Sequence, residues 1–371
     1  MRLIATCKLG LESVVAGELR ALGIEEIEVQ DARIFFEGDE NTLARALLWL
    51  RAAERVLLEV ASFPARTFDE LFEGVKALDW KQYIPRDAFI HVNGKSAKST
   101  LFSVSDCQRI TKKAIVDNLL AAYRTHSLPE TGAEVIVEVG MLRDTATLAL
   151  DACGAGLSRR GYRTYNVEAP LSETLGAGLI LLSRYRGGRP FVDPMCGSGT
   201  LPIEAAMIAQ NRAPGMGRSF AAETWGFLPA ACFTNARLAA REAVRNEKVE
   251  ILGADIDERS VKLAKQHAKK AGVMVDWAVQ DVRNMHETRT GGVLIANPPY
   301  GARMMSEAEA GRLYRDMRTV FDQLSGWGVH IFSAYREFER VYGKRAHKRR
   351  KLSNGGMVCT YYQYFPGKDT D

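Results

Sequence analysis

The chain has 371 residues, 46% apolar content, 26% charged content and a formal net charge of +5. This length predicts two or three domains with real hydrophobic cores. No run of 18 apolar residues occurs, which excludes a membrane-spanning helix, and six scattered cysteines without a Cys-x-x-Cys pair exclude a zinc ribbon and a disulfide framework. The start, Met1–Cys7, turns polar too soon for a signal peptide, so we expect a cytoplasmic protein that uses neither a membrane nor a metal.

Residues 1–64 show a periodicity that predicts the order strand, helix, strand, strand, helix, strand, which is a ferredoxin-like subdomain. Its four strands are expected at Arg2–Cys7, Ile24–Val29, Ala32–Glu37 and Arg55–Phe63. Its two helices are expected at Leu11–Leu22 and Asn41–Leu50.

Residues 65–153 form a second α+β unit. Helices are expected at Thr67–Leu78 and Ser103–Ala122, and strands at Ala88–Val92, Ala133–Met141 and Thr145–Asp151. Glycines and arginines follow in residues 154–165, which predicts a linker between domains.

Residues 166–371 alternate strands with helices, which predicts an α/β domain with a doubly wound, largely parallel sheet. Its strands are expected at Pro190–Asp193, Glu250–Ala254, Val275–Val279, Val293–Ala296, Val329–Phe332 and Met357–Tyr364. Its helices are expected at Leu171–Tyr185, Thr200–Gln210, Thr234–Asn246, Asp257–Ala271 and Glu307–Leu324. The sheet looks complete by itself, so we expect this half to fold without residues 1–165.

A glycine-rich turn in the segment Phe191–Thr200 predicts one ligand site. Gly197 and Gly199 let the backbone pass close to a ligand, and Ser198 and Thr200 are expected to cap the helix that follows. The turn has no Gly-Lys-Ser/Thr ending, which excludes an ATP-type phosphate loop, and no acidic residue follows at the spacing of a dinucleotide fingerprint. Asp193 at the front of the turn suits a cationic ligand better than a pyrophosphate.

A second motif, Asn297–Tyr300, follows the buried run Gly292–Ala296 at a predicted strand end. Two prolines stiffen the loop, so that the Asn297 side-chain oxygen and the Pro298 carbonyl can point as two acceptors at one exocyclic amine. Tyr300 offers a flat face for a base. An ordinary turn is the alternative, and the glycine-rich turn upstream favours the functional interpretation.

Together these motifs resemble those of class I methyltransferases that use S-adenosylmethionine and act on exocyclic amines. The resembling strings are Asp-Pro-x-Cys-Gly-Ser-Gly-Thr, Gly-x-Asp-Ile-Asp, Gln-Asp and Asn-Pro-Pro-Tyr. Leu150–Arg163 resembles the end of a THUMP RNA-binding domain, Ala169–Leu175 the segment before the first catalytic strand, and Lys351–Gly355 with Cys359–Tyr362 a closing hairpin. Nearly the whole chain is similar to the bacterial RlmL-type 23S rRNA guanine-N2 methyltransferases. Ala152-Cys153 departs from an expected Thr/Ala-Ser pair, which affects a structural segment only.

The resemblance implies a Rossmann-like catalytic domain, preceded by the ferredoxin-like subdomain and a THUMP domain, and a set of site residues. The catalytic residues are Asn297, Pro298, Pro299 and Tyr300. The cofactor-binding residues are Asp193, Pro194, Cys196, Gly197, Ser198, Gly199, Thr200, Asp255, Ile256, Asp281, Val282 and Asn297. In this assignment Asp255 accepts the ribose hydroxyls, Ile256 packs on adenine, and Asp281 accepts the adenine amine with Val282 as backbone partner. Asp257 is the expected helix cap, and a plain turn is the alternative for Asp281.

Basic side chains in two regions are expected to bind RNA. The run Gly343–Lys351 holds six Lys and Arg residues in nine positions, and its alternative interpretation is a solvated loop. The chosen residues are Lys95, Lys98, Lys112, Lys113, Lys348, Arg349 and Arg350, with Arg109 and Arg124 as further candidates.

The expected function is methylation of a guanine N2 amine in 23S rRNA by a monomer or weak dimer. The alternatives are N6-adenine methylation of RNA or DNA, guanine-N2 methylation of tRNA, and a non-catalytic RNA-binding protein. His267, His286 and His330 lack metal-ligand spacing and are expected to be structural or exposed.

Overall fold

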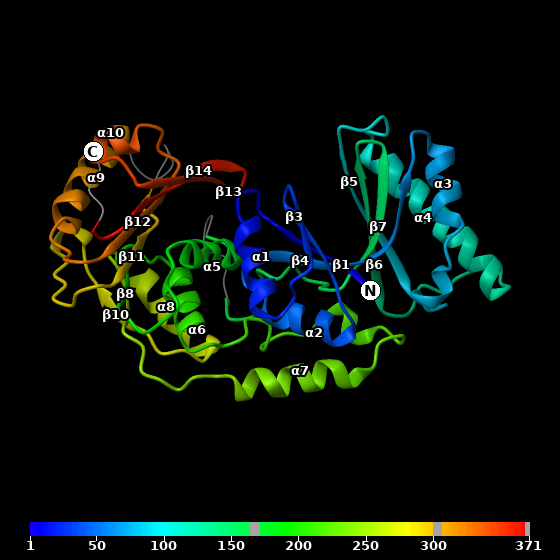
Figure 1. Cartoon of the computed structure of the whole chain (residues 1–371), viewed down its shortest axis with the longest axis horizontal. Coiled ribbons are helices and arrows are strands. Elements are labelled where there is room, and N and C mark those ends of the chain that lie inside the picture. The colour runs from blue at the N-terminus through cyan, green and yellow to red at the C-terminus, as the bar shows by residue number, and fades with distance from the viewer. Residues whose placement is uncertain (164–170, 300–305, 368–371) are drawn as a thin grey trace.

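The computed structural model describes residues 1–163, 171–299 and 306–367 and contains two seven-stranded sheets, one in each half of the chain (Figure 1). No helix among the described residues is long and apolar enough to cross a membrane.

The first sheet has the strand order β2-β3-β1-β4-β7-β6-β5. Its strands are β1 (Arg2–Cys7), β2 (Ile27–Gln30), β3 (Arg33–Glu37), β4 (Ala53–Pro64), β5 (Phe89–Ala97), β6 (Glu134–Leu142) and β7 (Thr145–Asp151). The long strand β4 pairs with β1 through its first half and with β7 through its second half. The strands of residues 1–64 and those of residues 65–153 therefore form one continuous sheet. This continuity was not expected, because pairing between two units leaves no local sequence pattern.

Four helices and one short turn of 3₁₀ helix accompany this sheet. They are α1 (Glu12–Ala21), α2 (Glu40–Trp49), α3 (Phe68–Lys76), η1 (Trp80–Gln82) and α4 (Val104–Tyr123). α1 packs on β1–β3 and α2 on β4, while α3 lies along α4, which packs on β5 and β6 (Figure 1). Every element expected from the sequence in this half is present, with ends displaced by a few residues.

The second sheet has the order β10-β9-β8-β11-β12-β14-β13, in which β14 and β13 are antiparallel and the other strands are parallel. Its strands are β8 (Phe191–Asp193), β9 (Ile251–Asp255), β10 (Asp276–Val279), β11 (Val293–Ala296), β12 (Gly328–Ser333), β13 (Lys348–Asn354) and β14 (Met357–Tyr364). Its helices are α5 (Glu173–Leu182), α6 (Thr200–Ala209), η2 (Ala221–Thr224), α7 (Ala230–Glu242), α8 (Glu258–Ala271), η3 (Val282–Asn284), α9 (Glu307–Phe321) and α10 (Phe338–Tyr342). The doubly wound α/β prediction is confirmed. Strand order reverses at β8, and the carboxyl edge at this point is where open α/β sheets bind ligands.

Three details differ from the sequence expectation. The helix expected at Thr234 begins at Ala230, directly after Pro229. Ser198 and Thr200 do not cap α6, because its N-cap is Gly199 in the left-handed region (φ +87°) and no side chain completes the cap. The closing hairpin, expected from Lys351, starts with β13 at Lys348, so that its first strand includes the second half of the basic run and pairs along β14.

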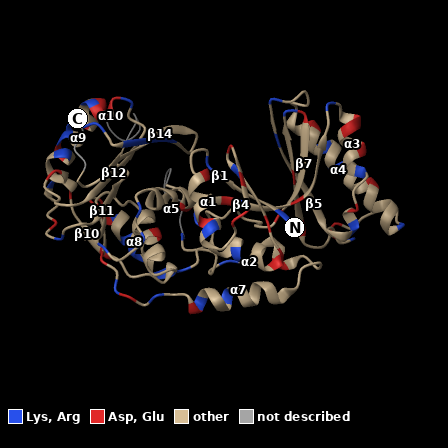
Figure 2. Ribbon diagram, in the orientation of Figure 1, with Lys and Arg blue, Asp and Glu red and all other residues tan. Residues whose placement is uncertain are grey.

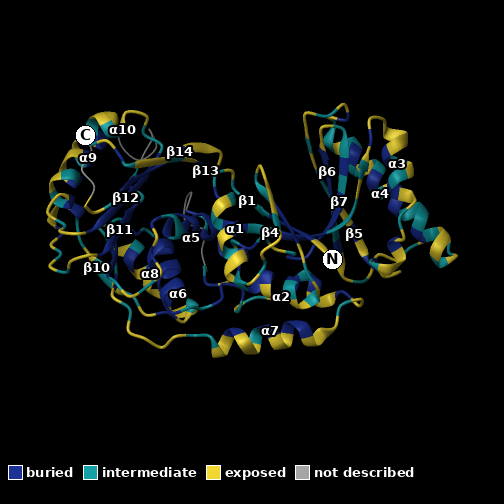
Figure 3. Cartoon of the chain, in the orientation of Figure 1, coloured by how far each residue is buried: buried dark blue, intermediate teal, exposed yellow. Residues whose placement is uncertain are grey.

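The two halves share one hydrophobic core (Figure 3). Its buried side chains include Leu11 of the segment entering α1 and Leu175 and Leu179 of α5. A Cβ atom added to Gly178 of α5 would lie 2.8 Å from the Leu11 side chain, so α1 and α5 are in close contact there. The second sheet is complete without residues 1–165, but its core is not. Deleting those residues would expose apolar surface.

The segment joining the halves is anchored by three buried side chains. Leu157, Arg160 and Tyr162 are each at most 4% exposed. The Arg218 guanidinium donates to the carbonyl oxygens of Cys153 and Gly156 and holds the start of this segment against the loop before η2. The predicted linker therefore acts as part of the interface.

Candidate active site

Polar side chains follow three neighbouring parallel strands at the switch point of the second sheet. Asp193 ends β8, Asp255 ends β9, and Asn297 follows β11. β8 pairs with β9 on one side and with β11 on the other. The strands thus bring together one residue from each predicted motif at a single carboxyl edge.

The glycine-rich turn lies directly over this edge. Gly197 N–H donates to Asp255 Oδ2 at 2.8 Å, and Cys196 N–H donates to the Ala254 carbonyl at 2.8 Å. A Cβ on Gly199 would lie 2.7 Å from the Trp277 ring, so this position requires glycine. A Cβ on Gly197 would meet nothing within 4 Å, and its φ is +51°. The turn is therefore fixed underneath and open on its Gly197 side.

Asp193 is buried to 1% exposure, and its Oδ1 accepts from Met195 N–H at 3.1 Å. Burial raises the pKa of this carboxyl well above its ordinary value, and the negative charge of Asp255 raises it further. A buried carboxyl facing a second carboxylate is a favourable place for a cation. The neighbouring Cys196 is also buried, and burial raises the pKa of its thiol. Cys196 is therefore an unreactive packing residue rather than a nucleophile.

Asp255 is held as a rigid acceptor. Its Oδ1 accepts from Asp257 N–H at 3.0 Å while its Oδ2 holds the turn. Asp257 caps α8 by accepting from the N–H groups of Arg259 and Ser260, which confirms the cap assignment. Ile256 lies between the two acids and is 66% exposed, so an apolar surface borders the carboxylate.

Asp281 reaches the same edge from β10, but it already has a partner. Both of its oxygens accept from the Arg283 guanidinium, with Nε at 3.0 Å from each, and Oδ1 also accepts from Arg283 N–H at 2.9 Å. The Arg283 hydrogen bonds lower the pKa of Asp281. Asp281 caps η3, and Val282 is buried behind it. Asp281 therefore lies in a local turn, which was the alternative to an adenine contact in the sequence analysis.

Asn297 carries an unsatisfied acceptor. Its Oδ1 is buried and finds no hydrogen-bond partner among the described residues. An unpaired buried acceptor costs free energy, so such an atom in a native fold calls for an explanation. The loop itself is anchored, because Tyr314 OH donates to the Pro299 carbonyl at 3.0 Å and Tyr314 is fully buried. Tyr300 lies outside the described residues.

One of the three histidines named in the sequence analysis contacts the glycine-rich turn. His267 is buried and its Nδ1 lies 3.0 Å from the Ser198 carbonyl, while His330 is a buried residue of β12 and His286 is exposed. Among the described ranges, no group of three or more His, Cys, Asp and Glu side chains is placed to hold a metal.

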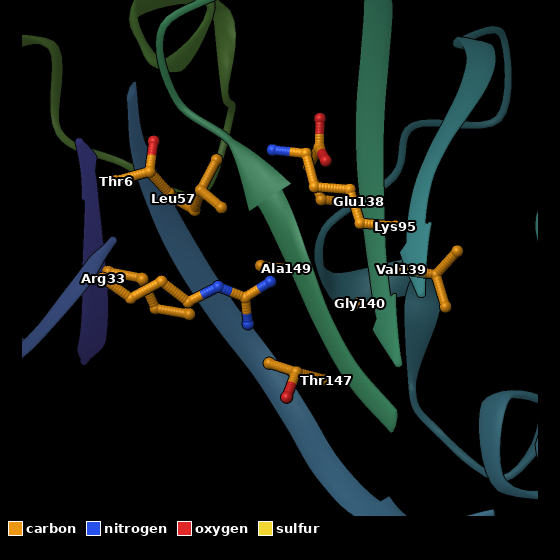
Figure 4. A pocket seen from close by; sticks show the side chains of 10 residues that line it. Thr6, Arg33, Leu57, Lys95, Glu138, Val139, Gly140, Thr147 and Ala149 are labelled. Carbon is orange, nitrogen blue, oxygen red and sulfur yellow. The ribbon is translucent and has the colours of Figure 1, made fainter. Parts of the chain in front are cut away.

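The predicted RNA contacts of the THUMP region divide into paired and unpaired cations. Lys112 pairs with Glu130, Arg109 pairs with Asp106, and the Lys113 ammonium lies over the Phe72 ring. Lys95 lines a pocket on the strand face opposite the helices (Figure 4). Arg33 lines it too, from another strand, and the sequence analysis missed it because the continuity of the first sheet was not predicted.

The basic residues of β13 also have separate roles. Arg350 donates to the Gly10 carbonyl at 2.5 Å and ties the second sheet to the first half, and Arg349 pairs with Glu339 at 2.7 Å. Lys348 is exposed. Lys and Arg are interspersed with Asp and Glu over most elements rather than gathered on one face (Figure 2).

Three known protein families match separate parts of the chain. The RMKL-like methyltransferase domain matches residues 160–363, the RlmL ferredoxin-like domain residues 2–57 and the THUMP domain residues 65–151.

Individual proteins match over nearly the full length. The protein named "Putative RNA methyltransferase YpsC" of Bacillus subtilis is 44% identical over 368 residues, which are 98% of this chain and 95% of that protein. A crystal structure from Listeria monocytogenes, described as "a predicted N6-adenine-specific DNA methylase", is 45% identical with a TM-score of 0.92 and covers 98% of this chain and 96% of its own. The crystal structure of SMU.472, complexed with SAH, is 40% identical with a TM-score of 0.92 and covers 100% of this chain and 99% of its own.

Proposed function

The chain belongs to the RMKL-like methyltransferase family, whose cofactor is S-adenosylmethionine, and we propose that it methylates the exocyclic N2 amine of a guanine in 23S rRNA. The observation that carries the proposal is the buried, unpaired Oδ1 of Asn297. It lies at the carboxyl edge that also holds Asp193 and the glycine-rich turn. A donor from outside the chain would satisfy it.

The residues at this edge fit the cofactor. Asp193 would pair with the cofactor's ammonium group, because a buried carboxyl beside a second acid favours a cation. The open side of Gly197 would admit the methionine part, and Asp255 with the exposed Ile256 would take the ribose and the adenine. Asp281 would share its acceptor capacity between Arg283 and the adenine amine. The bound cofactor supplies a sulfonium-activated methyl group.

Asn297 and Pro298 would position the target nitrogen. The lone pair of a nucleobase amine is delocalised into the ring, which makes the nitrogen a poor nucleophile. Acceptors for both N–H groups favour a pyramidal nitrogen with a localised lone pair. The Tyr314 hydrogen bond to Pro299 holds this loop in place, so the catalytic contribution is orientation. The base would have to leave its stack to present its amine to these acceptors.

RNA is the proposed substrate class because two observations agree. The chain carries a THUMP domain, and the relative from Bacillus subtilis is named as an RNA methyltransferase. The choice of 23S rRNA follows the resemblance to the RlmL type, supported by the RlmL ferredoxin-like match. As part of this proposal we place the protein in the cytoplasm, as a monomer or weak dimer.

N6-methylation of adenine is the second candidate. The Listeria monocytogenes structure carries that description at 45% identity, and adenine presents an amine with the same two donors. The geometry of Asn297 and Pro298 does not separate the two bases.

The test is nucleoside mapping in a strain that lacks the gene. The proposal expects one N2-methylguanosine to disappear from 23S rRNA and to return when the purified enzyme and S-adenosylmethionine are added to that RNA. Loss of an N6-methyladenosine instead would select the second candidate. Unchanged rRNA together with a change in tRNA would overturn the choice of substrate.

A further inference from the structure

Two loops of the THUMP region form one fixed surface, which we call the tip: residues 97–102 after β5, and the β6–β7 turn at residues 143–144. Asp144 joins them. Its Oδ1 accepts from Thr100 N–H at 2.6 Å, and its own N–H donates to Ser99 Oγ at 3.1 Å. The tip therefore has a defined shape although it consists of loops.

The backbone of the tip is strained. Lys98, Arg143 and Asp144 have φ values of +52°, +50° and +60°, in the left-handed region that favours glycine. A hairpin turn with two such residues normally uses Asn-Gly, whereas this one keeps Arg-Asp. Strain of this kind persists where the surroundings fix it, and it gathers at ligand sites.

Phe102 ends the first loop just before α4 and is 82% exposed. Its N–H donates to the Thr100 carbonyl at 3.1 Å, so the backbone under the ring is fixed to the joined loops. A single exposed apolar side chain is common on protein surfaces and needs no ligand. A planar ring on a rigid loop, however, is also what single-stranded nucleic acid uses as a stacking platform.

The joined loops also carry cations. Lys98 and Arg143 are exposed, and neither forms an ion pair with another described residue. Arg66 is anchored to Asp144 at 3.6 Å, with its side chain 76% exposed. The tip thus combines an aromatic face with positive charge, which is complementary to a base and its flanking phosphates.

We propose that the tip binds an unpaired nucleotide of the substrate RNA, with its base stacked on Phe102 and its phosphates contacting Lys98 and Arg143. This inference rests on RNA being the substrate and adds where the RNA is held away from the catalytic edge. The site is sequence-tolerant, because every base has a face that can stack.

The direct experiment titrates the full-length protein into a short single-stranded RNA that contains 2-aminopurine, whose fluorescence falls when it stacks. Wild type and Phe102→Tyr should quench it with similar affinity. Phe102→Ala and Phe102→Leu should bind roughly five- to a hundred-fold more weakly, as expected for one lost stacking contact. Leu keeps the apolar character without the ring, so the pair Leu and Tyr separates stacking from simple hydrophobic contact.

Met274→Ala is the matched control, because Met274 is 77% exposed on the catalytic half. It should bind like wild type. No quenching by wild type, equal binding by Phe102→Leu, or an equal loss in Met274→Ala would each overturn the proposal. Lys98→Gln with Arg143→Gln should also reduce the slope of log affinity against log salt by about 0.7 per lost phosphate contact.

Methyl transfer to rRNA distinguishes this inference from the proposed function. If wild type methylates rRNA and the Phe102→Leu variant does so with an unchanged KM, the tip is not a binding site although the proposed function stands. If wild type binds the oligonucleotide through Phe102 but methylates no RNA, the proposed function fails and the tip remains an RNA contact.

Discussion

Arg160 and Glu204 form an ion pair inside the protein, with Arg160 Nε 3.4 Å from Glu204 Oε1 and both side chains nearly excluded from water. Arg160 belongs to the segment between the halves and Glu204 to α6, the helix that follows the glycine-rich turn. Arg160 also donates to the Leu157 and Arg51 carbonyls, and Tyr162 OH donates to Glu204. One buried pair therefore joins the first half, the connecting segment and the cofactor-side helix.

Arg160→Leu should destabilise the protein by about 3–5 kcal/mol, because it leaves the Glu204 charge buried without its partner. Urea unfolding of the full chain measures this loss. The double variant with Glu204→Gln should be more stable than Arg160→Leu alone, since the neutral amide still accepts from Tyr162. A double variant that is no more stable would show that the uncompensated charge is not the cause.

Asn297→Ala should lower the rate of methyl transfer about 10²–10³-fold, by analogy with the loss of an oxyanion-hole hydrogen bond. Cofactor affinity should stay nearly unchanged, since the main proposed contact of Asn297 is to the target amine and the other cofactor-binding residues remain in place. Single-turnover kinetics and calorimetry give the two quantities separately. Asn297→Asp keeps an acceptor at the same place and should retain part of the activity. Near-normal methylation by the Ala variant would refute the assigned role.

Cofactor affinity should increase as pH rises above the ordinary Asp pKa of about 3.9, up to about pH 7.5, where an amino group stays protonated. Burial and the Asp255 charge raise the pKa of Asp193, and only its ionised form pairs with the ammonium. The free energy of unfolding of the protein without cofactor should instead decrease as pH rises. The native state binds the Asp193 proton more tightly than the unfolded chain does. The stability that this proton contributes is therefore lost as pH rises through the raised pKa. In Asp193→Asn the pH dependence of binding should disappear and affinity should fall, as calorimetry across this pH range can determine.

His330 should make the protein sensitive to mild acid. Burial lowers the pKa of His330 from 6.5 to about 3, aided by the nearby charge of Arg189, and neither ring nitrogen has a hydrogen-bond partner among the described residues. Stability is therefore fully present above pH 6.5 and is lost as pH falls toward 3, by up to about 1.4 kcal/mol per pH unit. Compared with wild type, His330→Leu should gain about 2 kcal/mol between pH 7 and pH 5. The exposed His286→Leu is the control and should gain little; an equal gain there would assign the effect elsewhere.

Two basic residues of β13 should separate binding from structure. Lys348→Gln should weaken RNA binding and reduce its salt dependence without changing stability, because Lys348 is exposed. Arg350→Gln should destabilise the chain, because Arg350 Nη1 bonds the Gly10 carbonyl across the interface of the halves. Filter binding at several salt concentrations and urea unfolding distinguish the two effects. If both variants weakened RNA binding equally and left stability unchanged, both residues would be phosphate contacts, as the sequence predicted.

Much of the fold could be predicted because most helices and strands follow from local patterns of apolar and polar residues. The buried run before Asn297 and the short strand before Asp193 are apolar segments that end in polar motifs, and both became neighbouring strands. Asp257 could be assigned as a cap from its position before a helix. Relationships between distant residues could not be predicted. Arg350 looked like a phosphate contact, and only the folded chain shows that it meets Gly10.

Exposure was the other unpredictable quantity. Phe102 is an aromatic residue of the kind usually counted toward a core, yet it lies almost entirely in solvent. Asp281 stood in the expected place, but the fork of Arg283 on its two oxygens depends on a side-chain rotamer rather than on spacing. Such features depend on the assembled surroundings of a residue and not on its neighbours in sequence.

The continuous first sheet also fixes the distance between the tip and the interface of the two halves. One end of β4 pairs with β1, close to the interface where β13 contacts the first half through Arg350 and Gly10. The other end of β4 pairs with β7, beside the tip. Hydrogen-bonded backbone therefore spans the first half from the tip to its interface with the second half, and the shared hydrophobic core joins that interface to the second sheet. If the substrate RNA binds at both proposed places, its target base would have to lie at a set distance from the nucleotide held at the tip. Adding or removing a nucleotide between those points would then bring a different base to the catalytic edge.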